Sequence, residues 1–326
     1  MKDYAIIYNP TSAAGKSKIE FDLACKTLSS LGIQYDLFHT ERFGHGIGLA
    51  TQLANDGYRI IGAGGDGTCN EVFNGAMLSS KKPLVGFIPM GSGNDIPGAI
   101  GIKPDVKRAC EIIAEGKTGT TDIGLSINAQ KEKRWFLGIG SQGFDAEVTK
   151  RTNEAAKTKQ GTKNYVAMVL KTVFSFKKRP IRMTCDSEKF EGLCNLVAVG
   201  NGPSYGGWMF ICQHATVHDG MFHITIVDMG NLPLLINFNK MYSKTLMPHP
   251  KVKVFSSKRV KIEMINQTDQ PYIAQVDGEI IGDLPVEYEI IPEGYEFIRP
   301  ETNEVEAWFM AKFGKKYEQH CAKFPQ

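Results

Sequence analysis

Short apolar runs alternate with amphipathic stretches through the first part of the chain. The apolar runs predict strands over residues 4–8, 34–39, 58–63, 84–88 and 121–125. Between them, apolar side chains recur at helical spacing and predict helices over residues 18–31, 47–55, 69–78 and 106–115. Strands separated by helices form a parallel sheet, and ligands bind such sheets at the carboxyl ends of the strands.

The pattern changes after about Gly124, where strand-like runs follow one another with few helices between them. Only residues 164–176 and 232–242 have clear helical spacing, and strands are predicted over residues 135–140, 181–185, 193–200, 222–227, 260–265, 272–276 and 286–291. The fold class is therefore an α/β N-terminal domain with a parallel sheet, plus a mainly β, sandwich-like C-terminal domain. We place these domains at residues 1–124 and 125–300, followed by an amphipathic tail at 301–326.

Length and charge limit the possible partners. A chain of 326 residues suits two domains, and its 38 basic and 35 acidic residues give no overall charge for a nucleic-acid partner. Its 7 cysteines include no C-x-x-C pair or zinc-like spacing, which favours free thiols in a reducing cytoplasm. We find neither a signal-peptide pattern nor an apolar run of the ~20 residues that a spanning helix needs.

Three glycine-rich loops follow predicted strands. Residues 9–16 read NPTSAAGK, which resembles a Walker A loop with Pro10 in place of its first glycine. Residues 64–68 read GGDGT, and Asp66 inside a phosphate-binding turn is useful if a metal ion lies between carboxylate and phosphates. Residues 91–95 read GSGND and offer backbone N–H groups, a hydroxyl and a carboxylate.

Simpler interpretations exist for parts of these motifs. Thr68 and Glu71 have the T-x-x-E spacing of a capping box at a helix start, which can coexist with phosphate binding. Gly62 extends the second loop to G-x-G-x-x-G, but no acidic residue follows the next strand to bind a ribose. Asp277-Gly278 between two strands predicts a hairpin turn.

The three loops, taken in this order, resemble the catalytic domain of diacylglycerol kinases, which sphingosine, ceramide and bacterial lipid kinases share. The motifs are N-P-x-S-x-x-G-K, G-G-D-G-T-x-N-E-V and G-S-G-N-D. Further similar segments lie at residues 102–105, 121–124, 140–146, 200–202, 205–207, 219–222 and 276–279, so the resemblance runs from about Asp3 to Pro300. NAD kinases share G-G-D-G-T, and more distantly phosphofructokinases do; G-S-G-N-D and the β-rich second half favour the lipid kinases.

The resemblance implies the following site residues. The ATP site would be lined by Asn9, Pro10, Ser12, Gly15, Lys16, Thr40, Gly64, Gly65, Asp66, Gly67, Thr68, Glu71, Gly91, Ser92 and Asn94. Asp66, Asp95 and Asp122 would form a network around a catalytic Mg²⁺. Glu279 matches the proton acceptor, and Asp277 would come with it from the second domain. A second Mg²⁺ site would use Asp219 and the Met221 carbonyl, but Thr216 replaces its first aspartate, which predicts weak binding there.

The expected activity is ATP-dependent transfer of a phosphate to a lipid hydroxyl, with diacylglycerol giving phosphatidic acid as the first candidate. A NAD kinase-like activity on a soluble nucleotide and a nucleotide-binding regulator without turnover are the alternatives. The lipid would be met at the inner face of the membrane by a peripheral, cytoplasmic protein. A homodimer is compatible with the resemblance.

Two features could bring the protein to that membrane. Basic side chains occur in two runs, the first with Lys150, Arg151, Lys157, Lys159 and Lys163 and the second with Lys177, Lys178 and Arg179. Residues 304–324 read as an amphipathic helix that either docks on the protein or lies in the interface. A solvated basic face is an equally simple interpretation of the runs.

Overall fold

The computed structural model describes residues 3–11, 17–157, 165–266 and 272–323. The chain forms two compact units, Met1–Thr121 with Glu293–Lys312, and Asp122–Pro292 with Phe313–Gln326. The first unit thus also contains residues 293–312, which the sequence analysis placed in the second domain and the tail. The second unit begins at Asp122, close to the predicted boundary.

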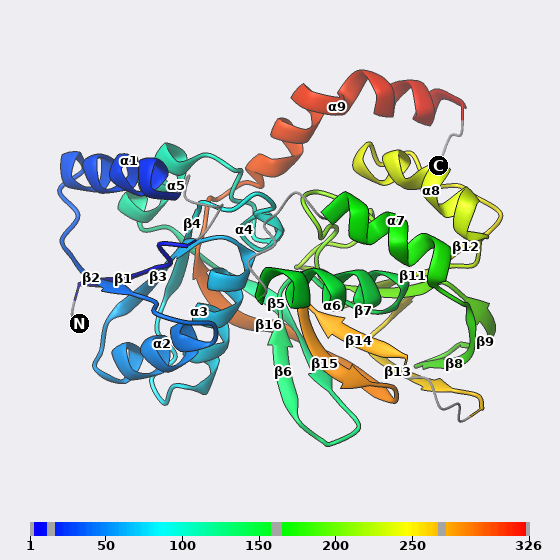
Figure 1. Cartoon of the computed structure of the whole chain (residues 1–326). Coiled ribbons are helices and arrows are strands. Elements are labelled where there is room, and N and C mark those ends of the chain that lie inside the picture. Colours follow the sequence, from blue (N-terminus) through cyan, green and yellow to red (C-terminus); the bar gives the residue numbers. More distant parts are fainter. Residues whose placement is uncertain (1–2, 12–16, 158–164, 267–271, 324–326) are drawn as a thin grey trace. The chain divides into compact units, whose positions relative to one another are not determined.

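The first unit is built on a parallel sheet (Figure 1). Its strands β1 (Tyr4–Tyr8), β2 (Tyr35–His39), β3 (Arg59–Gly64) and β4 (Val85–Pro89) are ordered β2-β1-β3-β4. Every residue of β1 and β4 is buried, because helices cover both faces of a parallel sheet, whereas the edge strand β2 is largely exposed. The predicted α/β domain is confirmed.

Helices connect these strands. They are α1 (Ser17–Ser30), α2 (His45–Asn55), α3 (Asp66–Leu78), α4 (Asp95–Ala99) and α5 (Val106–Glu115). Helices α1 and α5 pack together on one face of the sheet, and α2 and α3 on the other (Figure 1). Because the strands are parallel, the loops that enter α1, α3 and α4 all leave the carboxyl edge of the sheet.

The second unit contains two layers of antiparallel strands. One sheet has the order β12-β11-β10-β7-β14-β15, from β7 (Ile139–Gly143), β10 (Leu196–Gly200), β11 (Phe222–Val227), β12 (Val252–Ser257), β14 (Ile273–Val276) and β15 (Glu279–Asp283). The other layer runs β16-β13-β8-β9, from β8 (Arg179–Cys185), β9 (Lys189–Cys194), β13 (Arg259–Met264) and β16 (Val286–Ile298). Strand β5 (Thr118–Ile127) pairs with β16 and with β6 (Lys133–Phe136). The sandwich-like fold is confirmed.

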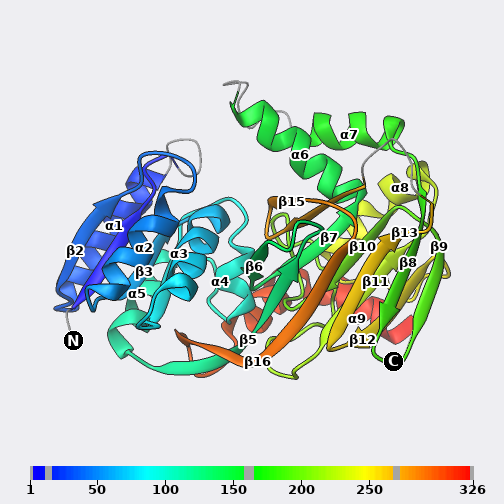
Figure 2. The same cartoon turned by 90° about the horizontal axis from the view of Figure 1, so that it is seen from below.

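Strand β10 shows how the sequence builds both faces of the six-stranded sheet. Val197 and Val199 enter the core between the two layers, beside Phe136 and Tyr288. The alternate residues Leu196 and Ala198 pack on the opposite face. That face is covered by α6 (Phe144–Lys157), α7 (Tyr165–Ser175) and α8 (Asn231–Tyr242), as Figure 2 shows.

Helix α6 was not expected from the sequence, which has few apolar residues there. Phe144, Ala146 and Val148 are buried at its start, and the rest of the helix is mostly charged or polar. The tail was predicted correctly as a helix: α9 spans Glu304–Lys323, with Phe309 completely buried and Arg108 Nε donating to Glu304 Oε1 at 2.8 Å. The start of the tail therefore docks on the protein.

All seven cysteines lie in the described residues, and each is a free thiol, as the sequence suggested. Five are buried, and Cys25 and Cys321 are partly exposed. Burial raises the pKa of Cys110, Cys194 and Cys212 to about 12 each. Among the helices that the structure describes, none is long and apolar enough to cross a bilayer.

Candidate active site

The predicted nucleotide-binding residues of the first unit gather at the carboxyl edge of its sheet. Tyr8 at the end of β1 pairs with His39 on one side and Ala63 on the other. Asn9, Thr40 and Gly64, which come next in the three strands, are therefore neighbours in register. Asn9 Oδ1 accepts hydrogen bonds from Thr11 N at 3.0 Å and from Thr11 Oγ1 at 2.8 Å, which turns the chain after β1.

Part of the first glycine-rich loop is not described. Ser12, Gly15 and Lys16 lie outside the described residues, whereas Pro10 is exposed at the edge of that segment. Their predicted nucleotide contacts stay predictions.

The second and third glycine-rich loops are joined by a close backbone contact. Met90 N donates to the Gly64 carbonyl at 2.8 Å, where β4 ends beside β3. A Cβ at Gly91 would stand 2.6 Å from the Cα of Gly65, and a Cβ at Gly65 would stand 3.3 Å from the Cα of Gly91. The contact between the two loops therefore leaves no space for a side chain at Gly91 and little at Gly65.

Asp66 fastens the third loop to the second. Its Oδ2 accepts from Asn94 N at 2.8 Å, and its Oδ1 accepts from Ile96 N at 2.9 Å. Asn94 adopts a left-handed backbone (φ 65) and closes the loop by accepting from Gly91 N and donating to Gly91 O, both at 2.8 Å. Gly67 and Ser92 are exposed on these loops, and Asp95 is buried. The Asp66 carboxylate thus has a clear role in shaping the site.

The capping box predicted for Thr68 and Glu71 is wrong. Helix α3 begins at Asp66, and no side chain caps its start. Glu71 instead accepts hydrogen bonds from Gly44 N and Gly46 N, both at 2.8 Å, at the start of α2. Thr68 lies within the first turn, against Gly64. The positive end of the α2 dipole favours a negatively charged carboxylate at this position. The contact with α2 therefore accounts for Glu71 without the predicted contact to a nucleotide.

In the second unit, Asp122 contacts the loop that contains the predicted second metal site. Asp122 N donates to the Val217 carbonyl at 2.8 Å, and Asp122 Oδ2 accepts from Gly220 N at 2.7 Å. Asp219 Oδ1 accepts from Met221 N at 3.1 Å, and its Oδ2 lies 2.8 Å from His223 Nε2. Protein groups thus contact both Asp219 oxygens, and the weak second metal site stays a prediction.

Asp277 and Gly278 form the turn between β14 and β15, as the sequence predicted. Both have left-handed backbones, with φ 47 and φ 86, as a type I′ turn requires. Asp277 Oδ2 accepts from Leu137 N at 2.9 Å, and its Oδ1 accepts from the amides of Gly138 and Ile139 at 3.0 Å each. Glu279 follows as the first residue of β15 and is half-buried.

Among the described residues, no three Asp, Glu, His or Cys side chains come close enough together to form a metal site. Mg²⁺ in phosphoryl-transfer sites is usually held by one or two carboxylates with substrate phosphates and water, so it needs no such cluster. Asp66 and Asp95 supply two carboxylates of this kind in the first unit, in the GGDGT and GSGND loops that Asp66 joins. The donor set of the first unit therefore fits a Mg²⁺–nucleotide complex.

Asp145 is an ionisable residue that sequence reasoning did not single out. It lies in the first turn of α6, exposes 7% of its surface, and lies beside Ser141 and Tyr205. Burial raises its pKa to about 6, and hydrogen bonding offsets only part of that shift. The only signal for it was its place in the similar segment 140–146.

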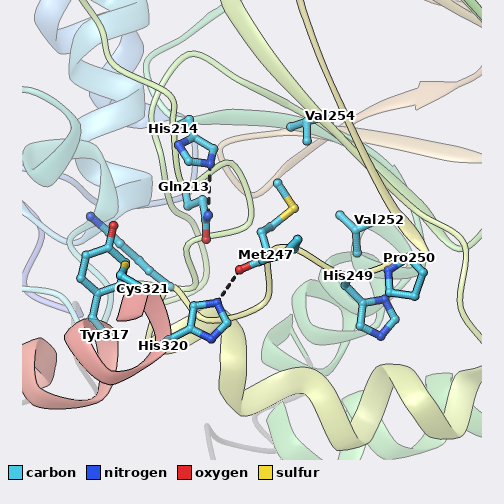
Figure 3. A pocket seen from close by; sticks show the side chains of 12 residues that line it. Gln213, His214, Met247, His249, Pro250, Val252, Val254, Tyr317, His320 and Cys321 are labelled. Carbon is cyan, nitrogen blue, oxygen red and sulfur yellow. Dashed lines mark hydrogen bonds between the residues drawn. The ribbon is translucent and has the colours of Figure 1, made fainter. Parts of the chain in front are cut away.

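One cavity of the second unit is lined by none of the predicted site residues. It measures about 650 Å³ and opens between the end of α9 and residues 244–254 (Figure 3). His320 Nε2 donates to the Met247 carbonyl there, and Gln213 Nε2 lies 3.1 Å from His214 Nε2. Burial lowers the pKa of His214, so neutral imidazole is favoured. Its three histidines contact separate groups and form no cluster of the kind that holds a metal, as far as the described residues go.

Comparisons with known proteins cover nearly the whole chain. The family model of the diacylglycerol kinase catalytic domain matches residues 3–126, and that of the YegS C-terminal NAD kinase beta sandwich-like domain matches residues 138–299. A diacylglycerol kinase of Staphylococcus aureus (strain bovine RF122 / ET3-1) is 31% identical over 285 residues, which are 87% of this chain and 88% of the relative. One from Staphylococcus carnosus (strain TM300) is 30% identical over 297 residues, 90% of this chain and 94% of the relative.

A solved structure shows the same fold. The crystal structure of a candidate diacylglycerol kinase from Bacillus anthracis str. Sterne superposes with a TM-score of 0.72. It is 22% identical in sequence, and the superposition covers 92% of this chain and 97% of that one. Both units of the chain therefore have counterparts in one known two-domain structure.

Proposed function

Because the chain belongs to the diacylglycerol kinase family, we propose that it transfers the γ-phosphate of ATP to the hydroxyl of a membrane lipid, with diacylglycerol the first candidate acceptor. Family membership supports the coarser statement, that the protein is a lipid kinase. The observation that supports the use of ATP is the junction of the GGDGT and GSGND loops, held by Asp66 at the carboxyl edge of the sheet.

This junction is suited to holding phosphate. The start of α3 directs backbone N–H groups and the positive end of its dipole toward the loop edge. Gly65 and Gly91 keep the surface there free of side chains, so a phosphate can approach the backbone closely. Asp66 and Asp95, with Asp122 as a further candidate, would hold Mg²⁺, which neutralises phosphate charge when bound.

Glu279 is the better candidate for the base. The Asp277 carboxylate already accepts three backbone N–H groups, so it is suited to positioning the hairpin. In the proposed reaction, the lipid hydroxyl oxygen bonds to the γ-phosphorus as the bond to the bridging oxygen breaks. ADP leaves, and the hydroxyl proton passes to the Glu279 carboxylate.

The test is a transfer assay with labelled ATP and a panel of acceptors. Diacylglycerol, other lipids with a hydroxyl beside long chains, and NAD⁺ would be offered in parallel, the lipids in mixed micelles. We expect labelled lipid, dependence on Mg²⁺, and no labelled NAD⁺. Labelling of NAD⁺ alone would favour the NAD kinase-like alternative, and nucleotide binding without any labelled product would favour a regulator.

A further inference from the structure

The two basic runs of the sequence meet at one cavity in the second unit. The cavity measures about 320 Å³ and lies between α6, the end of α7 and the first residues of β8 and β14. Helices α6 and α7 lie side by side there (Figures 1 and 2). Its charged lining residues are Glu147, Lys150, Arg151, Lys177 and Arg179, and Ser175 and Tyr272 are the lining residues with hydroxyl groups.

The cavity concentrates positive charge in a chain that is otherwise balanced. Four basic and one acidic side chains line it, which gives 4 − 1 = +3, and the net charge of the whole chain is also +3. The one acid is already engaged, because Glu147 Oε1 accepts from Arg151 Nε at 2.8 Å. The space is therefore suited to an anion.

Arg151 is held in place before any ligand arrives. Its Nε bonds Glu147 on the same helix, and its Nη1 donates to Ser175 Oγ at 3.0 Å across to α7. A guanidinium has five N–H donors, so two such bonds leave others for a ligand. A fixed, planar guanidinium matches the oxygens of phosphate.

The two lysines of the cavity have no acidic partner within the described part of the chain. Neither Lys150 nor Lys177 forms an ion pair with any acidic side chain that the structure describes. Lys178, between the two cavity residues of its run, instead pairs with Asp228. The second basic run is thus divided, and only part of it faces the cavity.

Exposed apolar side chains lie on α7, whose end lines the cavity, and on α8, which packs against α7. Phe174 on α7 is 81% exposed, and Leu232 and Ile236, one turn apart on α8, are 62% and 68% exposed. Helices α7 and α8 pack together, and Asn231 Nδ2 donates to the Phe176 carbonyl at 3.0 Å. Buried positions such as Val173 and Leu234 face the core, so these three residues belong to the outward face.

We propose that this cavity binds the phosphate of an anionic phospholipid while Phe174, Leu232 and Ile236 enter the interfacial layer of the bilayer. The cationic cavity selects for phosphate, and the apolar border favours a lipid as its source over free phosphate. The inference rests on the proposed function in one respect, since a lipid kinase must meet its acceptor at a bilayer. The cavity residues differ from all those assigned to the nucleotide and to proton transfer.

The test is cosedimentation of the full chain with vesicles of phosphatidylcholine alone or mixed with phosphatidic acid. The Lys150→Gln/Lys177→Gln variant is compared with Lys189→Gln/Lys258→Gln, which removes the same charge from exposed sites in the same unit. We expect wild type to prefer the anionic vesicles and the cavity variant to bind them about 30-fold more weakly, because each basic side chain contributes ~1 kcal/mol. The control should bind like wild type. Equal loss in both variants, or in neither, would overturn the proposal.

A second pair tests the apolar border. Phe174→Ala should weaken vesicle binding roughly 10-fold, whereas Leu193→Ala, also exposed in the second unit, should not. Titration with inorganic phosphate separates the two sources of the anion. If phosphate alone displaced the protein from vesicles and Phe174→Ala had no effect, the site would be one for free phosphate and the lipid proposal would be rejected.

Cosedimentation needs no turnover, so it separates this inference from the proposed function. Cavity-dependent vesicle binding by a protein without kinase activity would keep the inference and reject the function. Thermal melting checks that the variants fold. A folded cavity variant should retain activity on a short-chain acceptor in micelles and lose it on anionic vesicles; loss on both would contradict the proposal.

Discussion

The two units present their candidate residues in different ways. In the first unit, the residues follow buried parallel strands, so that Asn9, Thr40 and Gly64 reach one edge through register alone. In the second unit, a hairpin turn carries Asp277 and Glu279, and Asp277 binds amides about 140 positions away in sequence. In the proposed function this contrast would separate two tasks, because the sheet edge would bind the nucleotide and the hairpin would present the base.

The largest expected effect is on the sheet edge. Asp66→Asn should lower turnover by about 10⁴-fold. The substitution would weaken both the contact with the cation and the hydrogen bonds that Asp66 accepts from the amides of Asn94 and Ile96. Steady-state kinetics with saturating acceptor measure it. Asp105→Asn, at another carboxylate that accepts a backbone N–H in the same unit, is the control and should leave turnover unchanged. Near-normal turnover in Asp66→Asn would refute its assignment.

The hairpin should show a change in turnover without a change in nucleotide binding. Glu279→Gln is expected to reduce kcat by about 10³-fold and to leave ATP affinity as it was, because a base acts on the acceptor. Equilibrium ATP binding and kcat are measured together. Asp283→Asn, exposed on the same strand, is the control. If Asp277→Asn lowered kcat more than Glu279→Gln at equal stability, the two roles would be exchanged.

The buried Asp145 should make the stability of the second unit depend on pH. Its folded pKa of about 6 lies above the ordinary value of 3.8, so the folded form binds the proton more tightly. The free energy of unfolding therefore falls as the pH rises from about 4 to about 6. The total loss is about 3 kcal/mol, and it is complete above that range. Asp145→Asn should raise the melting temperature at pH 8 and leave it unchanged at pH 4. The same increase at both pH values would rule out titration of this group as the cause.

The smallest expected effect concerns Glu71, which the structure ties to α2. Glu71→Gln should lower the free energy of unfolding of the first unit by about 1–2 kcal/mol. The reason is that it weakens one of the two charge-assisted hydrogen bonds that Glu71 accepts from the amides of Gly44 and Gly46. ATP affinity should stay within error of wild type. A large loss of ATP affinity at unchanged stability would restore the nucleotide contact that the sequence suggested.

The sequence predicted the parts of the fold that depend on local pattern. The apolar run at residues 4–8 is β1, and the Asp277-Gly278 pair is a hairpin turn with the expected backbone. Helix α6 was missed because its stability comes from packing three early side chains rather than from an apolar stripe along its length. Local periodicity cannot show such a contact in advance.

The sequence allowed candidate site residues to be named, but it did not allow their contacts to be predicted. The T-x-x-E spacing at Thr68 and Glu71 suggested a local cap, whereas Glu71 reaches the start of α2, 25 and 27 positions earlier. Tertiary packing decides this, because Gly75 allows α3 to approach the Ile47 carbonyl of α2 closely. The convergence of Lys150 and Lys177 on one cavity likewise required the fold.

The distribution of thiols provides a built-in pair of labelling positions. Cys25 belongs to the first unit and Cys321 to the second, and these two are the partly exposed members of the seven. The five buried thiols are protected from maleimide reagents, and those with raised pKa values supply little reactive thiolate at neutral pH. Native protein could therefore carry one fluorophore on each unit without any engineered cysteine. Energy transfer between the dyes would then follow the separation of the units as nucleotide and vesicles are added.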